Sequence, residues 1–272
     1  MRICVLAFDG LEYDLVVKWR LRHLMQKYYG AYKSLVNPKY GKPYTPTCWA
    51  SFISGKPMEE HKVTTWWSWG AILEKLRYFP PFVWVKGKRK ILMRLGIRPK
   101  LRTLPSYITT IFDVIKPSVA LFIPSYNEPI EFRNMYDDAA KKGLKELEKT
   151  IWAIHEIRKN IFFEYLDKDD WRLLMCWFDL ADMIAHLYSS RRSKLRLMKA
   201  YFELNNIAKK VRERIGDDVA VLIVSDHGIQ KLPDGSIDHS NHGFWSLNVK
   251  PPFTPKEIID FYKLVIELAK RR

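Results

Sequence analysis

Cysteine is scarce in this chain of 272 residues, and its scarcity excludes one class of small fold. The three cysteines, Cys4, Cys48 and Cys176, lie far apart, so they do not form the framework of a disulfide-stabilised secreted domain. Long apolar runs are also missing, since none reaches the about 18 residues that a transmembrane helix needs. The apolar run before Asp9 is too short for a signal peptide. These absences predict a cytoplasmic protein.

Acidic residues are outnumbered by basic ones. The chain has 46 Lys and Arg against 30 Asp and Glu, which gives a net charge of +16 and a pI near 9.6. Such a charge favours anionic partners, whether a phosphorylated small molecule, nucleic acid or an anionic membrane. Internal repeats and low-complexity tracts are absent, and 47% of the residues are hydrophobic. The composition therefore predicts a globular protein with a substantial core.

Four short and almost wholly apolar runs are typical of strands that are buried on both faces of a parallel sheet. They cover residues 3–8, 119–124, 173–178 and 219–224. Helical patterns lie between and after them, at about residues 13–29, 137–166, 193–215 and 255–269. This alternation predicts an α/β fold, a three-layer sandwich with a mostly parallel central sheet. We expect a single catalytic domain over residues 1–272.

The segment at about residues 62–104 breaks this alternation. It begins with the aromatic stretch "TTWWSWGAILEKLRYFPPFVWV" and continues with eight positive charges and no acid in residues 86–102. We interpret it as an insertion or lid on the domain. The basic part is expected to be a solvated helix, and contact with nucleic acid or with an anionic membrane through residues 86–102 stays open.

Acids and histidines follow three of the predicted strands. Asp9 ends the first, Asp182 and His186 follow the third, and Asp226 and His227 follow the fourth. In open α/β sheets, ligands bind beyond the carboxyl ends of the strands. Each acid alone could cap a helix or a turn. Together they predict a site at one edge of the sheet.

The residue types in this pattern indicate a metal. Carboxylate oxygen with neutral imidazole suits zinc, manganese or iron, and pure oxygen sites suit magnesium or calcium. His242, in "NHGF", raises the number of candidate ligands to six, which is enough for two ions at three ligands each. The sequence alone leaves the choice of ion open.

Thr45 is a candidate nucleophile. It stands just before "CWASFISG", a short helical run that Gly55 ends. A hydroxyl at a helix N-terminus gains from the helix dipole, and a metal ion would lower its pKa further. The alternative is that Thr45, or Thr47 two residues later, only caps the helix.

These pieces together resemble the alkaline phosphatase superfamily, and within it the type I phosphodiesterase/nucleotide pyrophosphatase family. The matching segments are "FDGLEYDLV", "YTPTCWASFISGKPMEEH", "TIFDVIKPSVALFIPSY", "FDLADMIAH", "VSDHG" and "NHGF", in family order along nearly the whole chain. The resemblance implies an alkaline-phosphatase-like core. It also implies a phosphodiesterase that uses two divalent ions per chain, with zinc favoured and manganese or magnesium as alternatives.

The resemblance also implies a role for each matching residue. One ion is assigned to Asp182, His186 and His242, and the other to Asp9, Thr45, Asp226 and His227. Thr45, ten residues before Gly55, would be the nucleophile and would carry a phospho-threonine intermediate. Asp179 and Asp238 are candidates for orienting the ligand histidines. His239 is expected to lie in a solvated turn, and a supporting role beside the ligands is the alternative.

One departure from the family concerns Cys48, which stands where eukaryotic nucleotide pyrophosphatases carry an asparagine. We expect Cys48 to be a small buried residue whose backbone N–H stays available as a donor. The substrate is therefore expected to be a small phosphorylated molecule, with a nucleotide as one candidate. A phosphomonoesterase or phosphonate hydrolase, and a non-catalytic nucleic-acid or membrane-binding relative, remain alternatives. The oligomeric state stays open.

Overall fold

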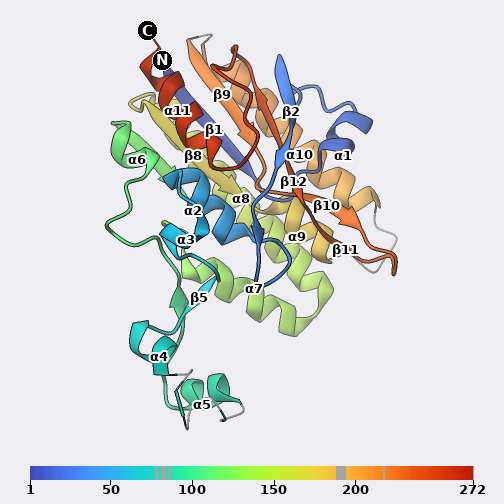
Figure 1. Ribbon diagram of the computed structural model, residues 1–272. Coiled ribbons are helices and arrows are strands. Elements are labelled where there is room, and N and C mark those ends of the chain that lie inside the picture. The colour runs from blue at the N-terminus through green and yellow to red at the C-terminus, as the bar shows by residue number, and fades with distance from the viewer. Residues whose placement is uncertain (77–78, 81–83, 85–86, 188–193, 217, 272) are drawn as a thin grey trace.

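Six strands form the central sheet of the computed structural model, which describes all residues except 77–78, 81–83, 85–86, 188–193, 217 and 272. The strands lie in the order β2-β12-β9-β1-β8-β7 (Figure 1). Their bounds are β1 Arg2–Phe8, β2 Tyr28–Lys33, β7 Ser118–Leu121, β8 Leu173–Phe178, β9 Val219–Val224 and β12 His242–Leu247. Strands β1, β7, β8 and β9 are parallel, and β12 is antiparallel to both neighbours. The predicted α/β fold with a mostly parallel sheet is confirmed.

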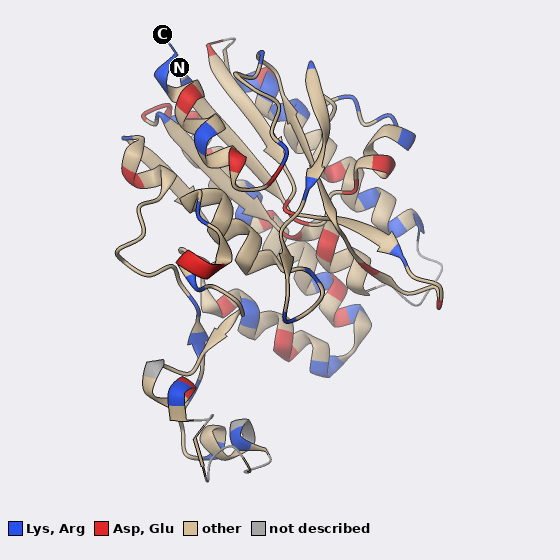
Figure 2. Cartoon of the chain, in the orientation of Figure 1, with Lys and Arg blue, Asp and Glu red and all other residues tan. Residues whose placement is uncertain are grey.

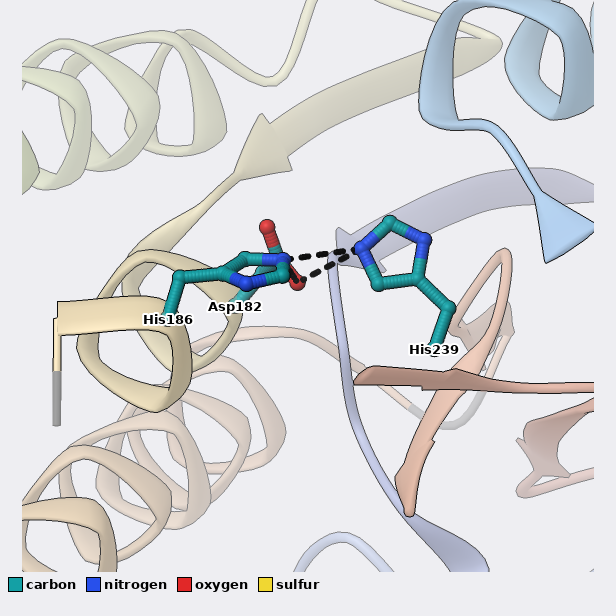
Figure 3. Close-up of side chains that lie close together, drawn as sticks. All are labelled: Asp182, His186 and His239. Carbon is teal, nitrogen blue, oxygen red and sulfur yellow. Dashed lines mark hydrogen bonds and ion pairs between the residues drawn. The ribbon is translucent and has the colours of Figure 1, made fainter. Parts of the chain in front are cut away.

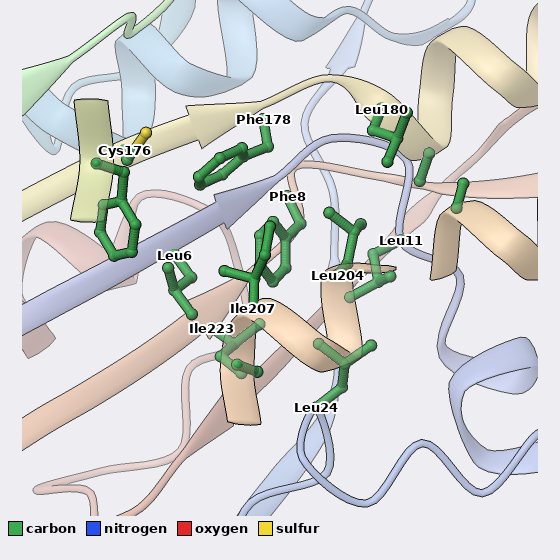
Figure 4. Close-up of a cluster of buried hydrophobic side chains, with 14 of the residues drawn as sticks. Leu6, Phe8, Leu11, Leu24, Cys176, Phe178, Leu180, Leu204, Ile207 and Ile223 are labelled. Carbon is green, nitrogen blue, oxygen red and sulfur yellow. The ribbon is translucent and has the colours of Figure 1, made fainter. Parts of the chain in front are cut away.

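Helices cover both faces of this sheet because successive side chains of a strand point to opposite sides. In β1, Ile3 and Val5 pack into one core and Leu6 and Phe8 into the other (Figure 4). The first core includes side chains of α2 Thr45–Ser54, α6 Ile111–Val114 and α11 Asp260–Lys270. The second includes side chains of α1 Tyr13–Lys18, α7 Ile130–Lys142, α8 Leu144–Lys168, α9 Leu180–Leu187 and α10 Lys194–Arg214.

The predicted strands agree closely with the observed ones. Strands β8 and β9 have the predicted bounds, and β1 begins one residue earlier than predicted. Strand β7 ends at Leu121 instead of residue 124, because Phe122 has a φ of +63° and leaves the extended conformation.

The predicted helix over residues 13–29 is wrong beyond Lys18. Helix α1 is only six residues long, and Arg20 adopts a φ of +51°. The chain then enters β2, whose Tyr28 pairs with Leu247 of β12. Long-range strand pairing outweighs the local helical pattern here, as tertiary context commonly does.

The predicted helix over residues 137–166 is two helices. Helices α7 and α8 meet at Gly143, whose φ of +110° breaks the run. Helix α10 matches the predicted helix at 193–215, although Ser193 itself lies outside the described residues. Helix α11 begins at Asp260, five residues later than predicted.

The aromatic and basic segment forms a projection from the body. After α3 (Met58–His61), strands β5 (Trp67–Ser68) and β6 (Lys100–Leu101) pair as its stem. Helices α4 (Ala71–Leu76) and α5 (Lys88–Arg94) lie beyond this stem, at the opposite end of the molecule from the two termini (Figure 1). We call residues 70–99 the arm. Parts of the predicted segment, at 77–78, 81–83 and 85–86, lie outside the described residues.

Two further pairs of short strands lie outside the central sheet. Strands β3 (Val36–Asn37) and β4 (Lys42–Pro43) form one pair, and β10 (Gly228–Lys231) and β11 (Ile237–Ser240) form the other. Within the described part of the chain, no helix is long and apolar enough to cross a membrane.

Candidate metal centre

The carboxyl ends of β1 and β9 bring together the first cluster, Asp9, Asp226 and His227. The Asp9 amide donates to the Phe178 carbonyl at 2.9 Å, which fixes the chain as it leaves β1. His227 Nε2 lies 3.1 Å from Asp9 Oδ1 and 3.5 Å from Asp226 Oδ2. All three residues are buried. Three atoms that can ligate a metal therefore converge within 4.8 Å of one another.

The orientation of the His227 ring is fixed by its other nitrogen. Nδ1 lies 3.0 Å from the Gly228 carbonyl, and because a carbonyl only accepts, Nδ1 carries the proton and donates. In the neutral ring, Nε2 then has a free lone pair directed at the two carboxylates. This is the tautomer that a histidine ligand adopts when a backbone carbonyl orients it.

The second cluster joins α9 to β11. Asp182 and His186 stand four residues apart in α9, on one face of the helix. His186 Nε2 lies 3.3 Å from Asp182 Oδ1 and 2.9 Å from Nε2 of His239 (Figure 3). His239 Nδ1 donates to the Pro43 carbonyl at 2.8 Å, which directs its Nε2 to the cluster. The pattern of the first cluster is thus repeated.

The two clusters are neighbours because the backbone after β1 passes tightly against α9. Gly10 has a φ of +69°, and a Cβ at this position would lie 2.8 Å from the Asp182 Cα. Only glycine fits so close a contact in this conformation. The rings of His227 and His239, one from each cluster, stack with centroids 3.7 Å apart.

Buried carboxylate oxygens without hydrogen bonds indicate that these clusters suit a cation. Asp9 Oδ1, Asp182 Oδ1 and both side-chain oxygens of Asp226 are buried and have no hydrogen-bond partner among the described residues. An unpaired buried charge is unfavourable unless protons or a metal compensate it. Oxygen and imidazole donors together fit zinc or manganese. The residues present therefore fit a metal site in both clusters.

Burial and the closeness of the charged groups shift the pKa values of the residues in both clusters. Burial and neighbouring carboxylates raise the pKa of Asp9 and of Asp226. Burial alone would raise the pKa of Asp182, but His186 lowers it overall. Asp182 in turn raises the pKa of His186 to about 9, and burial with the nearby His227 lowers the pKa of His239 to about 4. Because His239 Nδ1 donates to the Pro43 carbonyl, its Nε2 can accept a hydrogen bond from His186 Nε2 when no metal is bound.

Thr45 lies beside the first cluster as the first residue of α2. Its Oγ1 is 3.4 Å from His227 Nε2, and its side chain is buried. Gly55 ends the helix in the left-handed conformation, as the sequence predicted. Thr47 points elsewhere, since its Oγ1 accepts from the Asn37 amide at 3.2 Å. Of the two threonines, the structure brings Thr45 to the cluster.

A cavity of about 260 Å³ opens onto Thr45 and the second cluster. Its walls include two cations, Lys42 and Arg133, which the sequence analysis did not identify. The Arg133 guanidinium lies 3.8 Å from the centre of the Trp66 ring and pairs with Glu128 at 2.9 Å. Lys42 stands three residues before Thr45, so its nearness could have been suspected. Arg133 lies in α7, and no local pattern marks it.

His242 does not lie in the second cluster. His239 takes the position beside Asp182 and His186 that the resemblance had assigned to His242. His242 Nε2 lies 2.7 Å from Glu12 Oε1. The reason is the strand pattern: His239 pairs with Ile229 inside the β10–β11 hairpin and faces the site, whereas His242 begins β12. Glu12 also accepts from the Ile229 amide at 2.9 Å, so this pair holds the base of the hairpin that carries His239.

Three further expectations are resolved by contacts. Asp179 binds Arg158 at 3.0 Å and not a ligand histidine. Asp238 pairs with Lys42 and also accepts from the backbone amide of His239 at 2.8 Å. Cys48 is fully buried, as expected. Its N–H, expected to stay available, donates to the Tyr44 carbonyl at 3.0 Å within the first turn of α2.

A third group of possible ligands, His155, Glu156 and Glu203, lies between α8 and α10. Lys159 Nζ stands 2.5 Å from Glu156 and 2.8 Å from Glu203 and already compensates both carboxylates. This group is an ion-pair network between helices.

Comparison with known proteins gives the family of the chain. None of the curated proteins that were compared matches the chain. Phosphonoacetate hydrolase from Sinorhizobium meliloti 1021, solved with phosphonoformate, shares 13% identity and a TM-score of 0.51, and the match covers 87% of this chain and 59% of that one. Murine ectonucleotide pyrophosphatase/phosphodiesterase 5 shares 13% identity at a TM-score of 0.46, with 85% and 58% covered.

The chain spans less than two thirds of the length of these two solved proteins. A model of the type I phosphodiesterase/nucleotide pyrophosphatase family matches residues 3–244, which is most of the sequence and includes both clusters and Thr45. The chain belongs to the type I phosphodiesterase/nucleotide pyrophosphatase family.

Proposed function

We propose that the chain is a metal-dependent phosphoric ester hydrolase, a phosphodiesterase or nucleotide pyrophosphatase, with Thr45 as its nucleophile. The observation that carries this proposal is the pair of clusters whose buried carboxylate oxygens lack hydrogen-bond partners among the described residues. In the first cluster, His227 Nε2 lies 3.4 Å from the Thr45 hydroxyl. Membership of the family supports the same reaction class.

Two divalent ions per chain, with zinc as the first candidate and manganese or magnesium as alternatives, would occupy the clusters. Asp182, His186 and His239 would hold one ion, and Asp9, Asp226, His227 and the Thr45 oxygen would hold the other. When bound, such ions polarise phosphoryl oxygens and lower the pKa of a nearby hydroxyl. His239 thus replaces His242 in the set that the resemblance had suggested.

The residues of the chain would divide the remaining work. Thr45 Oγ1 would attack phosphorus, form a phospho-threonine and release the alcohol, and water would then cleave the new ester bond. The dipole of the ten-residue α2 favours negative charge at its N-terminus, where Thr45 stands. Lys42 and Arg133, on the wall of the cavity, would bind the anionic oxygens of the substrate.

A phosphomonoesterase or phosphonate hydrolase is the second candidate. Two cations in one cavity of about 260 Å³ would suit a substrate with two negative charges as well as a diester with one. A panel of p-nitrophenyl phosphate, bis-p-nitrophenyl phosphate and a phosphonate separates these candidates by their relative kcat/KM.

The decisive experiment is Thr45→Ala with bis-p-nitrophenyl phosphate in the presence of zinc or manganese. We expect turnover to fall by about a thousandfold or more, because losing a nucleophile removes the covalent route. Thr47→Ala is the matched control, since it removes a neighbouring hydroxyl that does not face the cluster. Its turnover should stay within a few-fold of the parent.

Two results would contradict the proposal. Equal turnover in both threonine variants would eliminate Thr45 as nucleophile. Purified protein that contains no divalent ion, takes up none and hydrolyses no ester would favour the non-catalytic alternative instead. About two bound ions per chain, measured by elemental analysis after dialysis, is the stoichiometry we expect.

A further inference from the structure

The arm exposes large apolar side chains at a density found nowhere else in the described part of the chain. Of the nineteen large hydrophobic side chains that are exposed among the described residues, eight lie within residues 72–97. They are Ile72, Leu76, Phe79, Trp84, Ile91, Met93, Leu95 and Ile97. Ile72 is 75% exposed and Leu95 is 71% exposed. A segment that exposes so many large apolar side chains is a candidate interaction site.

The same arm is strongly basic. Residues 70–99 contain eight Lys and Arg and one acid, Glu74. Glu74 is already paired with Arg102 of the stem. Figure 2 colours basic residues blue on α5, in the part of the arm farthest from the central sheet. The partner must therefore offer apolar material and negative charge together.

We propose that the arm docks on an anionic lipid bilayer, with its apolar side chains in the interface and its basic side chains on the phosphates. Six of its eight exposed apolar side chains are aliphatic, whereas nucleic acid would present stacking surfaces for aromatic rings. A lipid bilayer accepts both aliphatic and aromatic side chains. Basic residues beside Trp, Phe and Leu are typical of segments that lie in a membrane interface. Apolar content and charge thus both favour lipid.

A groove of about 1030 Å³ lies beside the cavity at Thr45 and reaches the arm. Glu74 and Lys75 of α4 are among its lining residues, and Tyr44 and Trp66 line both this groove and the cavity. Docking would therefore set the groove close to the lipid surface. This connection, unlike the docking itself, rests on the proposed function and points to a phosphoester in the bilayer as substrate.

Vesicle flotation tests the docking directly and needs no turnover. The full chain should float with vesicles of phosphatidylglycerol and phosphatidylcholine and not with phosphatidylcholine alone. Binding should weaken as salt rises, because screening shortens the reach of the basic residues. The double variant Ile72→Glu with Leu95→Glu should bind the anionic vesicles at least about tenfold more weakly, since it adds two negative charges at the interface.

Leu195→Glu is the matched control, because Leu195 is 78% exposed but lies on α10, outside the arm. It should bind like the parent. Failure to float with anionic vesicles, equal loss in Leu195→Glu, or release from vesicles by a single-stranded oligonucleotide would each overturn the proposal.

Turnover of bis-p-nitrophenyl phosphate without vesicles separates this inference from the proposed function. It should be unchanged in the double variant, because neither substituted residue lines the cavity. Binding to vesicles by an inactive protein would leave the docking proposal standing and refute only the hydrolase.

Discussion

The candidate metal centre buries charged groups, whereas the arm exposes apolar ones, so the two regions depart in opposite ways from the usual burial of apolar side chains and exposure of charge. At the metal centre, charged oxygens of Asp9, Asp182 and Asp226 are buried without hydrogen-bond partners among the described residues. In the arm, side chains such as Ile72 and Leu95 are exposed although water is a poor solvent for them. In both places the chain lacks the atoms that would complete the interaction. The difference in chemistry is the basis on which we propose a cation as the partner of the first region and lipid as the partner of the second.

The rest of the molecule provides the reference for this comparison. His61 is buried, yet its Nε2 meets Ser51 Oγ at 2.9 Å and its Nδ1 accepts from the Val63 amide at 3.0 Å. Buried polar groups are normally satisfied in this way. The lack of hydrogen-bond partners at the metal centre is therefore informative, and four measurements test its contrast with the arm.

Removal of divalent ions should have the largest effect. Hydrolysis should stop, and the free energy of unfolding should fall by about 4 kcal/mol for each ion that had been present at a thousandfold its Kd. Melting with EDTA, then with zinc or manganese added back, measures this. Asp182→Asn should show a much smaller shift on adding metal. Full activity after prolonged dialysis against EDTA would refute the metal centre.

The buried His61, whose two ring nitrogens both have hydrogen-bond partners, should make the free energy of unfolding depend on pH. Burial lowers the pKa of His61 from 6.5 to about 4. Between these values the unfolded chain binds a proton that the folded chain does not, so stability falls as the pH falls from 6.5 towards 4. The loss should reach about 3 kcal/mol.

Urea unfolding at several pH values checks this. His61→Gln should remove the part of the dependence that His61 contributes and leave the part due to His239, whose pKa is also lowered to about 4, whereas His23→Gln, at an exposed position, should leave both parts. An equal pH dependence in parent and His61→Gln would assign it to other groups.

Asp226→Asn should have a smaller effect of opposite sign. Without metal, the variant should be about 1–2 kcal/mol more stable than the parent at pH 8, because a buried charge beside Asp9 is removed. With metal, the parent should regain the advantage. Chemical unfolding with and without EDTA tests both halves. A variant that is less stable in EDTA would indicate that Asp226 is satisfied in the protein alone.

Leu95→Glu should have the smallest effect on folding. An exposed side chain contributes little to the core, so the free energy of unfolding should change by no more than about 0.5 kcal/mol. Urea unfolding of the variant beside Leu195→Glu measures this. A loss of several kcal/mol would mean that the arm packs against protein, and the contrast with the metal centre would then disappear.

Residues at the ends of predicted strands could be located from sequence because the pattern is local. Asp9 directly follows an apolar run, and parallel strands deliver their carboxyl ends to one edge. The same reasoning placed Asp182, His186, Asp226 and His227 near one another. The helix predicted from the local pattern of residues 13–29 was wrong, because the pairing of β2 with β12 outweighs that pattern.

The choice between His239 and His242 could not be made from sequence. They stand three residues apart, and which of them faces the site depends on the register of the β10–β11 hairpin and on Glu12. A shift of one residue in a strand turns every side chain to the other face. The cavity cation Arg133 had no local signal either, because α7 meets the site only through packing.

By itself the sequence determined the α/β fold, the edge of the sheet that carries the site and the nucleophile candidate Thr45. These follow from local apolar periodicity and from residues adjacent to it in the chain. Only the tertiary structure decided that His239 joins Asp182 and His186, that Lys42 and Arg133 line the cavity and that the arm stands away from the body. Those features depend on contacts between distant segments, whose geometry no local pattern encodes.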